Sequence, residues 1–461
     1  MNLTVPAAVA ALRTAFLDLL REGPGDFGSF EGGARSIAMA CCARAMSESL
    51  EERDRELAAS RPRGSRVHSR RPRSLATMCG DVRFSRTVLI DGAGLTRYPL
   101  DEELDLPAGD RVSPAARTFL VTCGADVPFS RAAALMGLAG GSAVSATTVM
   151  NSVRSAGAAI AAIERRRARD LFRDGVAPEA GSAAEEVLVE ADGTWVRMRD
   201  GSMSEVKAMV AYAGKEGGAR VEPVRLGCVG EAPGDFWEQA VAQVGSRFDL
   251  SRVERVRLGA DGEAQYVNGA ASMPFADVSV RIDPFHVFRA VGRCAPAPEG
   301  SRLVSVLRSG GAEACAGAID ALVERGRAAA GADKVAAYLR RHAAEIGGGP
   351  SMGTMEAEQQ HMYKVRMGSF PCAWSPEGAD AMARLRSWLG SGFGLPARTR
   401  ETAMSPARRE MRERRLAKHL ARRSGGRVQS EGKGWEYPHS ASLDGFRADV
   451  RYEAAGAPLG W

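Results

Sequence analysis

Three acidic residues stand where their carboxylates could do chemistry. Asp192 interrupts the apolar stretch "EEVLVEADGTWVRM", Asp261 ends the similar stretch "VERVRLGADG", and Glu356 opens the helical pattern "MEAEQQHMYKVRM". A carboxylate among buried strand residues needs a compensating charge, because removing it from water is costly. Asp-Gly is also a common turn sequence, so each aspartate taken alone has a structural explanation.

Together, the three acids could bind divalent cations. We expect Asp192 and Asp261 to lie on neighbouring strands, where like charges repel unless a cation lies between them. Mg²⁺ or Mn²⁺ prefers oxygen ligands, and Glu356 would complete a site for two ions. Such a site performs in-line displacement at phosphorus. Glu358 is the alternative third ligand, and the helix dipole alone also favours two glutamates near a helix N-terminus.

The spacing of apolar residues predicts the strands and helices that position these acids. From residue 185 the period changes from that of a helix toward that of a strand. The pattern predicts three strands, the amphipathic helix "GDFWEQAVAQVGSRF", and two further strands that end at Asp261 and Asp283. This is the element order of a ribonuclease-H-like core. We therefore predict the α/β fold class, with an RNase H-like catalytic core in residues 185–298 and 350–395.

Other regions surround this predicted core. Residues 1–60 have a helical pattern, and residues 61–110 combine a basic linker with a small β segment. Residues 111–180 form a helical region, and the alanine-rich residues 299–349 indicate a helical insertion. Residues 396–461 form a basic C-terminal tail.

Three helical pieces within residues 111–180 suit a helix-turn-helix. Ser113 precedes Pro114 as a predicted N-cap, and Ser145 can cap the third piece. The third helix could then enter a major groove of DNA. Short helical bundles that bind no DNA share this pattern. We expect the helical N-terminal part of the chain to include a DNA-binding region.

Basic residues are concentrated in a few stretches. "RPRGSRVHSRRPR" (61–73) holds six arginines and no acid, and residues 397–427 hold eleven Lys/Arg against three Glu. Clustered arginines are typical of proteins that bind a phosphate backbone, although solvated helices and tails also carry them. The candidate DNA contacts from these stretches and from "ERRRARD" are Arg70, Arg71, Arg73, Arg165, Arg166 and Arg167.

Composition limits the class of protein. No run of apolar residues is long enough for a membrane span, and the first residues lack a basic leader and a cleavage site. We therefore expect a cytoplasmic protein with no membrane partner. The eight cysteines lack the paired spacing of a structural zinc site, and we expect no disulfides.

Four motifs occur in order along the chain: "VEADGTWVRM", "LGADGEAQYV", "RIDPFHVFRA" and "MEAEQQHMYKVRMGSFPCAWSPEGADAMARLR". With the upstream "MCGDVRFSRTVLIDGAGLTRYPLDEELDL", they resemble the ISLre-type bacterial insertion-sequence transposases. The resemblance covers residues 70–395. One departure follows Asp261, where the family tends to show "DG-x-x-W-I" and this chain has "DGEAQYV".

The resemblance implies an RNase H-like DDE transposase. Asp192 and Asp261 match its two metal-binding aspartates, and Glu356 matches the glutamate that opens its last catalytic helix. "DPFH", which ends at His286, is similar to the (C/D)-x-x-H signature of Mutator-like relatives, in which the histidine lies near the active site. Two further residues match family positions that serve in DNA contact or local packing, namely Arg366 and Trp374.

The resemblance also implies partners. A transposase binds the terminal inverted repeats of its element and target DNA, and it acts as a homodimer or higher oligomer because two ends must be paired. Two alternatives remain at this point. The first is a non-catalytic DNA-binding protein derived from a transposase, and the second is a metal-dependent nuclease on the same fold.

Overall fold

The computed structural model describes residues 5–179, 181–282, 284–346, 355–368 and 372–398, together with 410, 411, 413, 414 and 417. The chain divides into two compact units. Unit 1 comprises residues 1–152 and 396–461, and unit 2 comprises residues 153–395.

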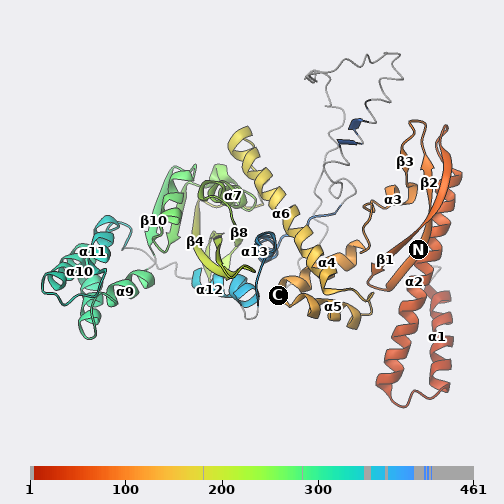
Figure 1. Ribbon diagram of the computed structural model, residues 1–461, viewed down its shortest axis with the longest axis horizontal. Coiled ribbons are helices and arrows are strands. Elements are labelled where there is room, and N and C mark those ends of the chain that lie inside the picture. The colour runs from red at the N-terminus through yellow and green to blue at the C-terminus, as the bar shows by residue number, and fades with distance from the viewer. Residues whose placement is uncertain are drawn as a thin grey trace. The chain divides into compact units, whose positions relative to one another are not determined.

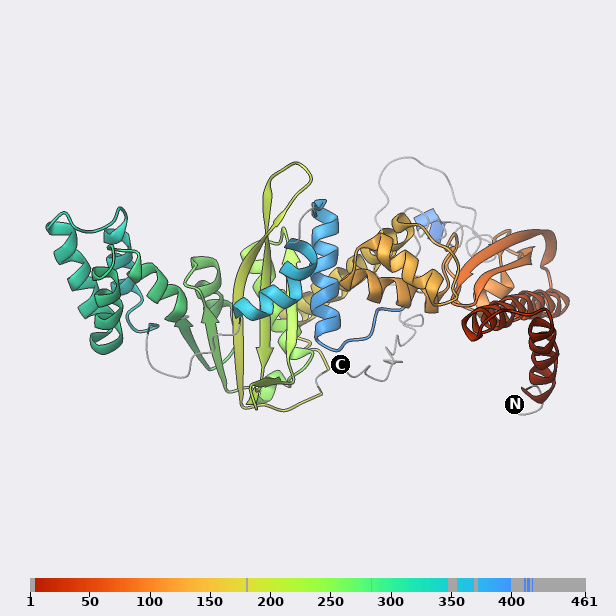
Figure 2. The same cartoon turned by 90° about the horizontal axis from the view of Figure 1, so that it is seen from below.

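Unit 1 begins with a helical hairpin of α1 (Val5–Arg21) and α2 (Phe27–Ala59). Helix α2 lies along an antiparallel sheet of β1 (Arg66–Thr77), β2 (Gly80–Ile90) and β3 (Thr96–Arg97), as Figure 2 shows in dark red and orange. The fully buried carboxylate of Asp54 on α2 accepts hydrogen bonds from the backbone N–H and the hydroxyl of Thr87 on β2.

Strand β1 differs from the linker expected over the arginine stretch. Residues from Arg66 onward pair with β2 along its whole length, and alternate side chains from Arg73 onward are buried. The sequence pattern hid this strand because arginine takes positions where an apolar residue marks a strand. Arg73 occupies a core-facing position, where Asp101 neutralises its charge at 2.8 Å.

Helices complete unit 1. After α3 (Pro99–Glu103) come α4 (Pro114–Asp126), α5 (Phe129–Leu138) and the long α6 (Ala146–Asp174), which continues into unit 2. The three helical pieces predicted from the sequence are confirmed. Ser113 caps α4 by accepting a hydrogen bond from the N–H of Ala116, and Ser145 accepts one from the N–H of Thr148.

A five-stranded mixed sheet forms the centre of unit 2. Its order is β10 (Asp277–Ile282), β9 (Arg255–Ala260), β4 (Glu186–Arg197), β5 (Met203–Tyr212) and β8 (Val224–Val229). Strands β4, β5 and β8 are antiparallel in succession, whereas β9 is parallel to β4 and β10 is parallel to β9. Small strands β6 (Gly214–Glu216) and β7 (Ala219–Val221) form a separate hairpin.

Helices cover both faces of this sheet. Helix α7 (Pro233–Gly245) packs Phe236, Trp237 and Val241 against the apolar side chains of one face. Helix α13 (Pro376–Gly390), with α12 (Met355–Gln359) and the π-helix η3 (Gln360–Gly368), lies on the other face. Gly227 permits this packing, because a Cβ there would lie 2.6 Å from the hydroxyl oxygen of Ser387.

Short helices connect the remaining strands. The 3₁₀ turn η1 (Leu250–Arg252) precedes β9, and α8 (Ala264–Val267) with η2 (Asn268–Ser272) lies between β9 and β10.

The predicted insertion is a helical bundle. Helices α9 (Pro284–Gly292), α10 (Glu299–Glu324) and α11 (Ala332–Arg341) group together in Figure 1 and share an apolar core. The bundle includes α9, which precedes the expected start of the insertion at residue 299. Its far end returns to the sheet, because the N–H of Ile282 on β10 donates to the carbonyl of Glu345 at 3.1 Å.

The predicted α/β class is confirmed by this arrangement of helices and mixed sheets. In the part of the chain that the structure describes, no helix has both the length and the apolar character needed to cross a membrane.

Helices α6 and α13 approach closely at Gly157, so this position tests the packing of unit 2. A Cβ at Gly157 would overlap the backbone of Ala381. We expect Gly157→Ala to lower the free energy of unfolding by about 1–3 kcal/mol, because the overpacked helices must separate. Urea denaturation would measure the change.

The matched control is Gly317 in α10, which is exposed and has open space where a Cβ would be. Gly317→Ala should leave stability unchanged or raise it by up to about 1 kcal/mol, because alanine favours the helix. Equal effects of the two substitutions would contradict the packing argument.

Candidate active site

Two aspartates stand in register where the parallel pairing of β4 with β9 ends. The last residue pair between β4 and β9 is Ala191 with Ala260. The next residues are Asp192, which continues along β4, and Asp261, which ends β9. Because successive side chains alternate between faces, the two carboxylates share the face opposite Ala191 and the α7 core.

Local backbone contacts hold both carboxylates. The N–H of Gly193 donates to Asp192 Oδ1 at 2.6 Å, and the N–H of Glu263 donates to Asp261 Oδ1 at 2.9 Å. A Cβ at Gly193 would overlap the carboxylate of Glu205, so a larger residue would displace this segment. Both Asp-Gly pairs therefore have local structural roles as well as a shared location.

The two carboxylates repel each other. Burial raises the pKa of Asp192 to about 7, and the negative charges of Asp261 and Glu263 add to the shift. The N–H of Gly193 and the imidazole of His286 act in the opposite direction. A partly buried acid pair of this kind is stabilised by a cation, and its oxygen donors suit Mg²⁺ or Mn²⁺.

His286 lies in the first turn of α9 and is half-buried. Its effect on the pKa of Asp192 places it in the surroundings of the aspartates. Asp283, the first residue of the "DPFH" motif, lies outside the described residues.

The third predicted ligand is on the same face of the sheet. Helix α12 contacts β4, where Gln359 Nε2 donates to the carbonyl of Gly193 at 3.0 Å. Glu356 precedes Gln359 by three residues, so it lies on the same side of the helix, and its side chain is exposed.

Glu358, the alternative ligand, is committed elsewhere. Its buried carboxylate forms ion pairs with Arg220, at 2.6 Å, and with Arg225. Two guanidinium groups thus occupy its oxygens, whereas the carboxylate of Glu356 is accessible to solvent.

The full metal-binding group is not assembled. Within the described ranges, no three His, Cys, Asp or Glu side chains lie close enough together to hold a metal ion. The structure brings Asp192, Asp261 and His286 into one neighbourhood, and it leaves Glu356 exposed on the adjacent helix.

The predicted DNA contacts of β1 fall into two groups. Arg70 and Arg71 are exposed, and Arg70 lies 3.7 Å from Asp54. Arg73 is buried, and it also donates to the carbonyl of Pro107 at 2.9 Å. Arg73 therefore supports the fold of unit 1 and is not a surface residue.

The three predicted DNA contacts on α6 lie within unit 2. Arg165 pairs with Glu231 at 2.8 Å, and Arg166 lies 4.0 Å from Asp170. Arg167 donates to Gln243 at 3.2 Å. Of these three candidates, Arg165 and Arg166 are exposed and Arg167 is half-buried.

Arg366 and Trp374 are packing residues. Both are buried, and the guanidinium of Arg366 lies 5.2 Å from the centre of the Trp374 ring. The indole N–H of Trp374 donates to the carbonyl of Met367 at 3.1 Å. The resemblance offered DNA contact or local packing for these two positions, and their burial fits local packing.

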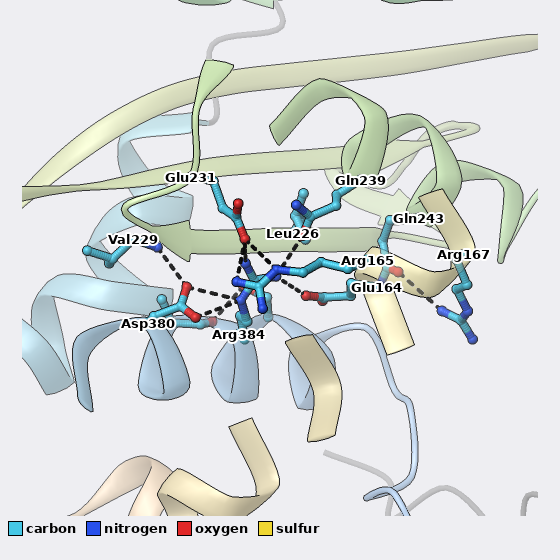
Figure 3. Close-up of polar contacts among 12 residues, drawn as sticks. Glu164, Arg165, Arg167, Leu226, Val229, Glu231, Gln239, Gln243, Asp380 and Arg384 are labelled. Carbon is cyan, nitrogen blue, oxygen red and sulfur yellow. Dashed lines mark hydrogen bonds and ion pairs between the residues drawn. The ribbon is translucent and has the colours of Figure 1, made fainter. Parts of the chain in front are cut away.

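A buried charge network, which the sequence did not reveal, fixes the helices around the sheet (Figure 3). Arg384 on α13 is fully buried and binds four side chains from α6, α7, α13 and the segment after β8. These partners are Glu164, Glu231 at 2.5 Å, Gln239 at 2.9 Å and Asp380 at 3.0 Å. An arginine in an amphipathic helix is usually exposed, so this role of Arg384 was not predictable from its position in the sequence.

The network contains more negative than positive charge. Three carboxylates surround Arg384, and Arg165 supplies the second cation at Glu231. Glu164 is fully buried, and its Oε1 has no hydrogen-bond partner. Burial raises the pKa of Glu164 to about 7, although Arg384 opposes the shift.

Comparison with known proteins gives a family. The family model described as "Uncharacterised protein family (UPF0236)" matches residues 28–300. Two relatives from Caldanaerobacter subterraneus subsp. tengcongensis, UPF0236 protein TTE0402 and UPF0236 protein TTE2489, are each 20% identical to this chain over 364 residues. The matches cover 75% of this chain, with 70% of the first relative and 75% of the second.

The raised pKa of Glu164 makes stability depend on pH. The folded chain binds a proton on Glu164 between pH 4.5, its ordinary pKa, and about pH 7, where the unfolded chain does not. The free energy of unfolding should therefore fall as pH rises through this window and then level off, with an amplitude of up to roughly 3 kcal/mol.

Glu164→Gln should remove this contribution, because the amide does not titrate. The stability of the variant relative to the wild type should then rise between pH 4.5 and pH 7, as measured by urea denaturation at several pH values. A constant difference across that window would mean that Glu164 is ionised in the folded chain.

Proposed function

The chain belongs to the uncharacterised protein family UPF0236, and we propose that it is a DDE transposase that cleaves DNA strands and transfers them. The observation that carries the proposal is the placement of Asp192 and Asp261 in register where the parallel pairing of β4 with β9 ends, with mutual repulsion and donors suited to a hard cation. The proposal also rests on the resemblance of the four motifs to the ISLre-type transposases.

The order of the sheet supports the RNase H-like part of the proposal. Three antiparallel strands of the sheet come first in the chain, and after one helix β9 joins β4 in parallel and β10 joins β9. This connectivity puts β4 and β9 side by side, so the residues that follow their paired stretch lie next to each other. The metal site of an RNase H-like enzyme requires such adjacent positions.

The proposed ligands are Asp192, Asp261 and Glu356. They would hold two Mg²⁺ or Mn²⁺ ions, which would activate the attacking oxygen and stabilise the leaving oxygen at phosphorus. Backbone and side-chain hydrogen bonds of the chain would hold these ligands in position. The N–H groups of Gly193 and Glu263 fix the two aspartates, and the hydrogen bond of Gln359 to Gly193 holds the helix of Glu356 against β4.

DNA is the proposed partner. The exposed arginines at positions 70, 71, 165 and 166 would contact phosphates, and two copies of the chain would pair the two ends of the element. Arg73, Arg366 and Trp374 are omitted from the proposed contact surface because they are buried.

A non-catalytic DNA-binding protein is the second candidate. It is favoured by one observation: no three potential ligands gather closely enough for a metal ion within the described ranges. Metal-dependent cleavage by the wild-type protein would exclude it.

The first test concerns the aspartates. We expect Asp192→Asn to abolish Mg²⁺-dependent cleavage and joining of DNA that carries the element's ends, with binding of the same DNA retained. The loss should be at least about a hundred-fold, because the carboxylate holds the ions that stabilise the transition state. The matched control is Asp235→Asn, at an exposed aspartate in the first turn of α7. Persistent cleavage by Asp192→Asn would refute the proposed site.

The second test separates the two glutamates of α12. Glu356→Gln should abolish cleavage and leave the free energy of unfolding within about 0.5 kcal/mol of the wild type, because the side chain is exposed. Glu358→Gln should lower that free energy by about 3 kcal/mol, because two partly buried arginines lose their counter-charge. Cleavage assays and urea denaturation on both variants would measure this. The reverse pattern would assign the ligand role to Glu358.

A further inference from the structure

Strands β4 and β5 extend beyond the five-stranded sheet. Strand β4 pairs with β9 only as far as Ala191, and β5 pairs with β8 only from Val206 onward. The two strands continue to pair with each other as far as Arg197 and Met203. Residues 192–205 therefore form a two-stranded ribbon that starts at the candidate active site.

The two faces of the ribbon differ. Thr194, Val196 and Met198 are buried on one face, and a bridge joins Met198 to Trp374. The opposite face carries Trp195, which is 59% exposed, and Met203, which is 53% exposed. We call this second face the open face of the ribbon.

The open face is positively charged. Arg197 lies on it and is exposed, and Arg199 is exposed at the turn that follows. Within the described part of the chain, neither arginine forms an ion pair. The acid opposite Trp195 is Glu205, and its carboxylate already accepts hydrogen bonds from the Tyr266 hydroxyl and from Gln265.

An exposed indole beside unpaired guanidinium groups suits one kind of ligand. A nucleic acid strand combines flat, apolar bases with phosphates, so it can use the ring and the charges together. A base must be unpaired to stack on a side chain, because both faces of a paired base are covered by its neighbours. An acidic protein would use the arginines but would gain little from the ring.

We propose that the open face of the ribbon binds single-stranded nucleic acid, with an unpaired base stacked on Trp195 and flanking phosphates bound by Arg197 and Arg199. This inference rests on the proposed function for the identity of the strand as DNA. Trp195 is three residues from Asp192, or about 10 Å along the strand. Asp192 lies on the opposite face of the ribbon, because successive side chains alternate, so a strand bound at Trp195 would have to pass around the ribbon to reach the candidate active site.

The test measures binding of a fluorescein-labelled twelve-nucleotide thymidine strand by anisotropy. It uses the full chain in EDTA, which excludes cleavage. Trp195→Ala should weaken binding about ten-fold, and Trp195→Phe should weaken it less than about three-fold, because a smaller ring still stacks. A strand containing 2-aminopurine should lose fluorescence on binding to the wild type and keep it with Trp195→Ala.

The control is Phe27→Ala, at an aromatic residue of α2 that is 75% exposed. It should bind the strand as the wild type does. Wild-type affinity in Trp195→Ala, or an equal loss in Phe27→Ala, would overturn the inference. Because EDTA binds the divalent cations that the proposed cleavage requires, the binding assay does not depend on whether the protein cleaves DNA. A protein that never cleaves DNA but needs Trp195 for strand binding would refute the transposase and leave this inference standing.

Discussion

The repulsion between two carboxylates that follow the paired stretch of β4 and β9 is the constraint on which the candidate site depends. Parallel pairing of β4 with β9 sets their register, and this register brings Asp192 beside Asp261. Burial raises the pKa of Asp192 to about 7, and the charge of Asp261 adds to the shift, so the fold maintains an unfavourable charge pair. In the proposed function, a divalent cation would relieve this repulsion.

Arginines neutralise several other carboxylates of unit 2. Arg220 and Arg225 neutralise Glu358, and Arg384 gathers Glu164, Glu231 and Asp380 in the buried network. The buried Glu164 and Glu358 are thus paired with arginines, and the buried Glu190 accepts a hydrogen bond from the Tyr212 hydroxyl, whereas Glu356 is accessible to solvent. An acid that is paired with an arginine stabilises the fold, whereas an exposed acid such as Glu356 is accessible to a ligand.

The sequence predicted much of the fold, because hydrophobic period and helix caps are local signals. The change of period near residue 185 located the central sheet, and Ser113 located the start of α4. Burial of arginines was not predictable, because it depends on partners far away in the chain. Arg73 meets Asp101 only after β1 forms, and Glu358 meets Arg220 only in the folded unit. The sequence therefore left Glu356 and Glu358 as alternatives, and their contacts distinguish them.

The helical bundle of α9 to α11 leaves the sheet after Ile282 and returns to it at Glu345, where a backbone hydrogen bond joins the two points. Its ends are adjacent, and its apolar core includes Ile282 of β10. The cost of closing a longer chain between two adjacent ends grows only slowly with its length. Insertions between its helices leave the acids of β4 and β9 in place, whereas exchange of the whole module would remove His286 of α9 from the surroundings of Asp192.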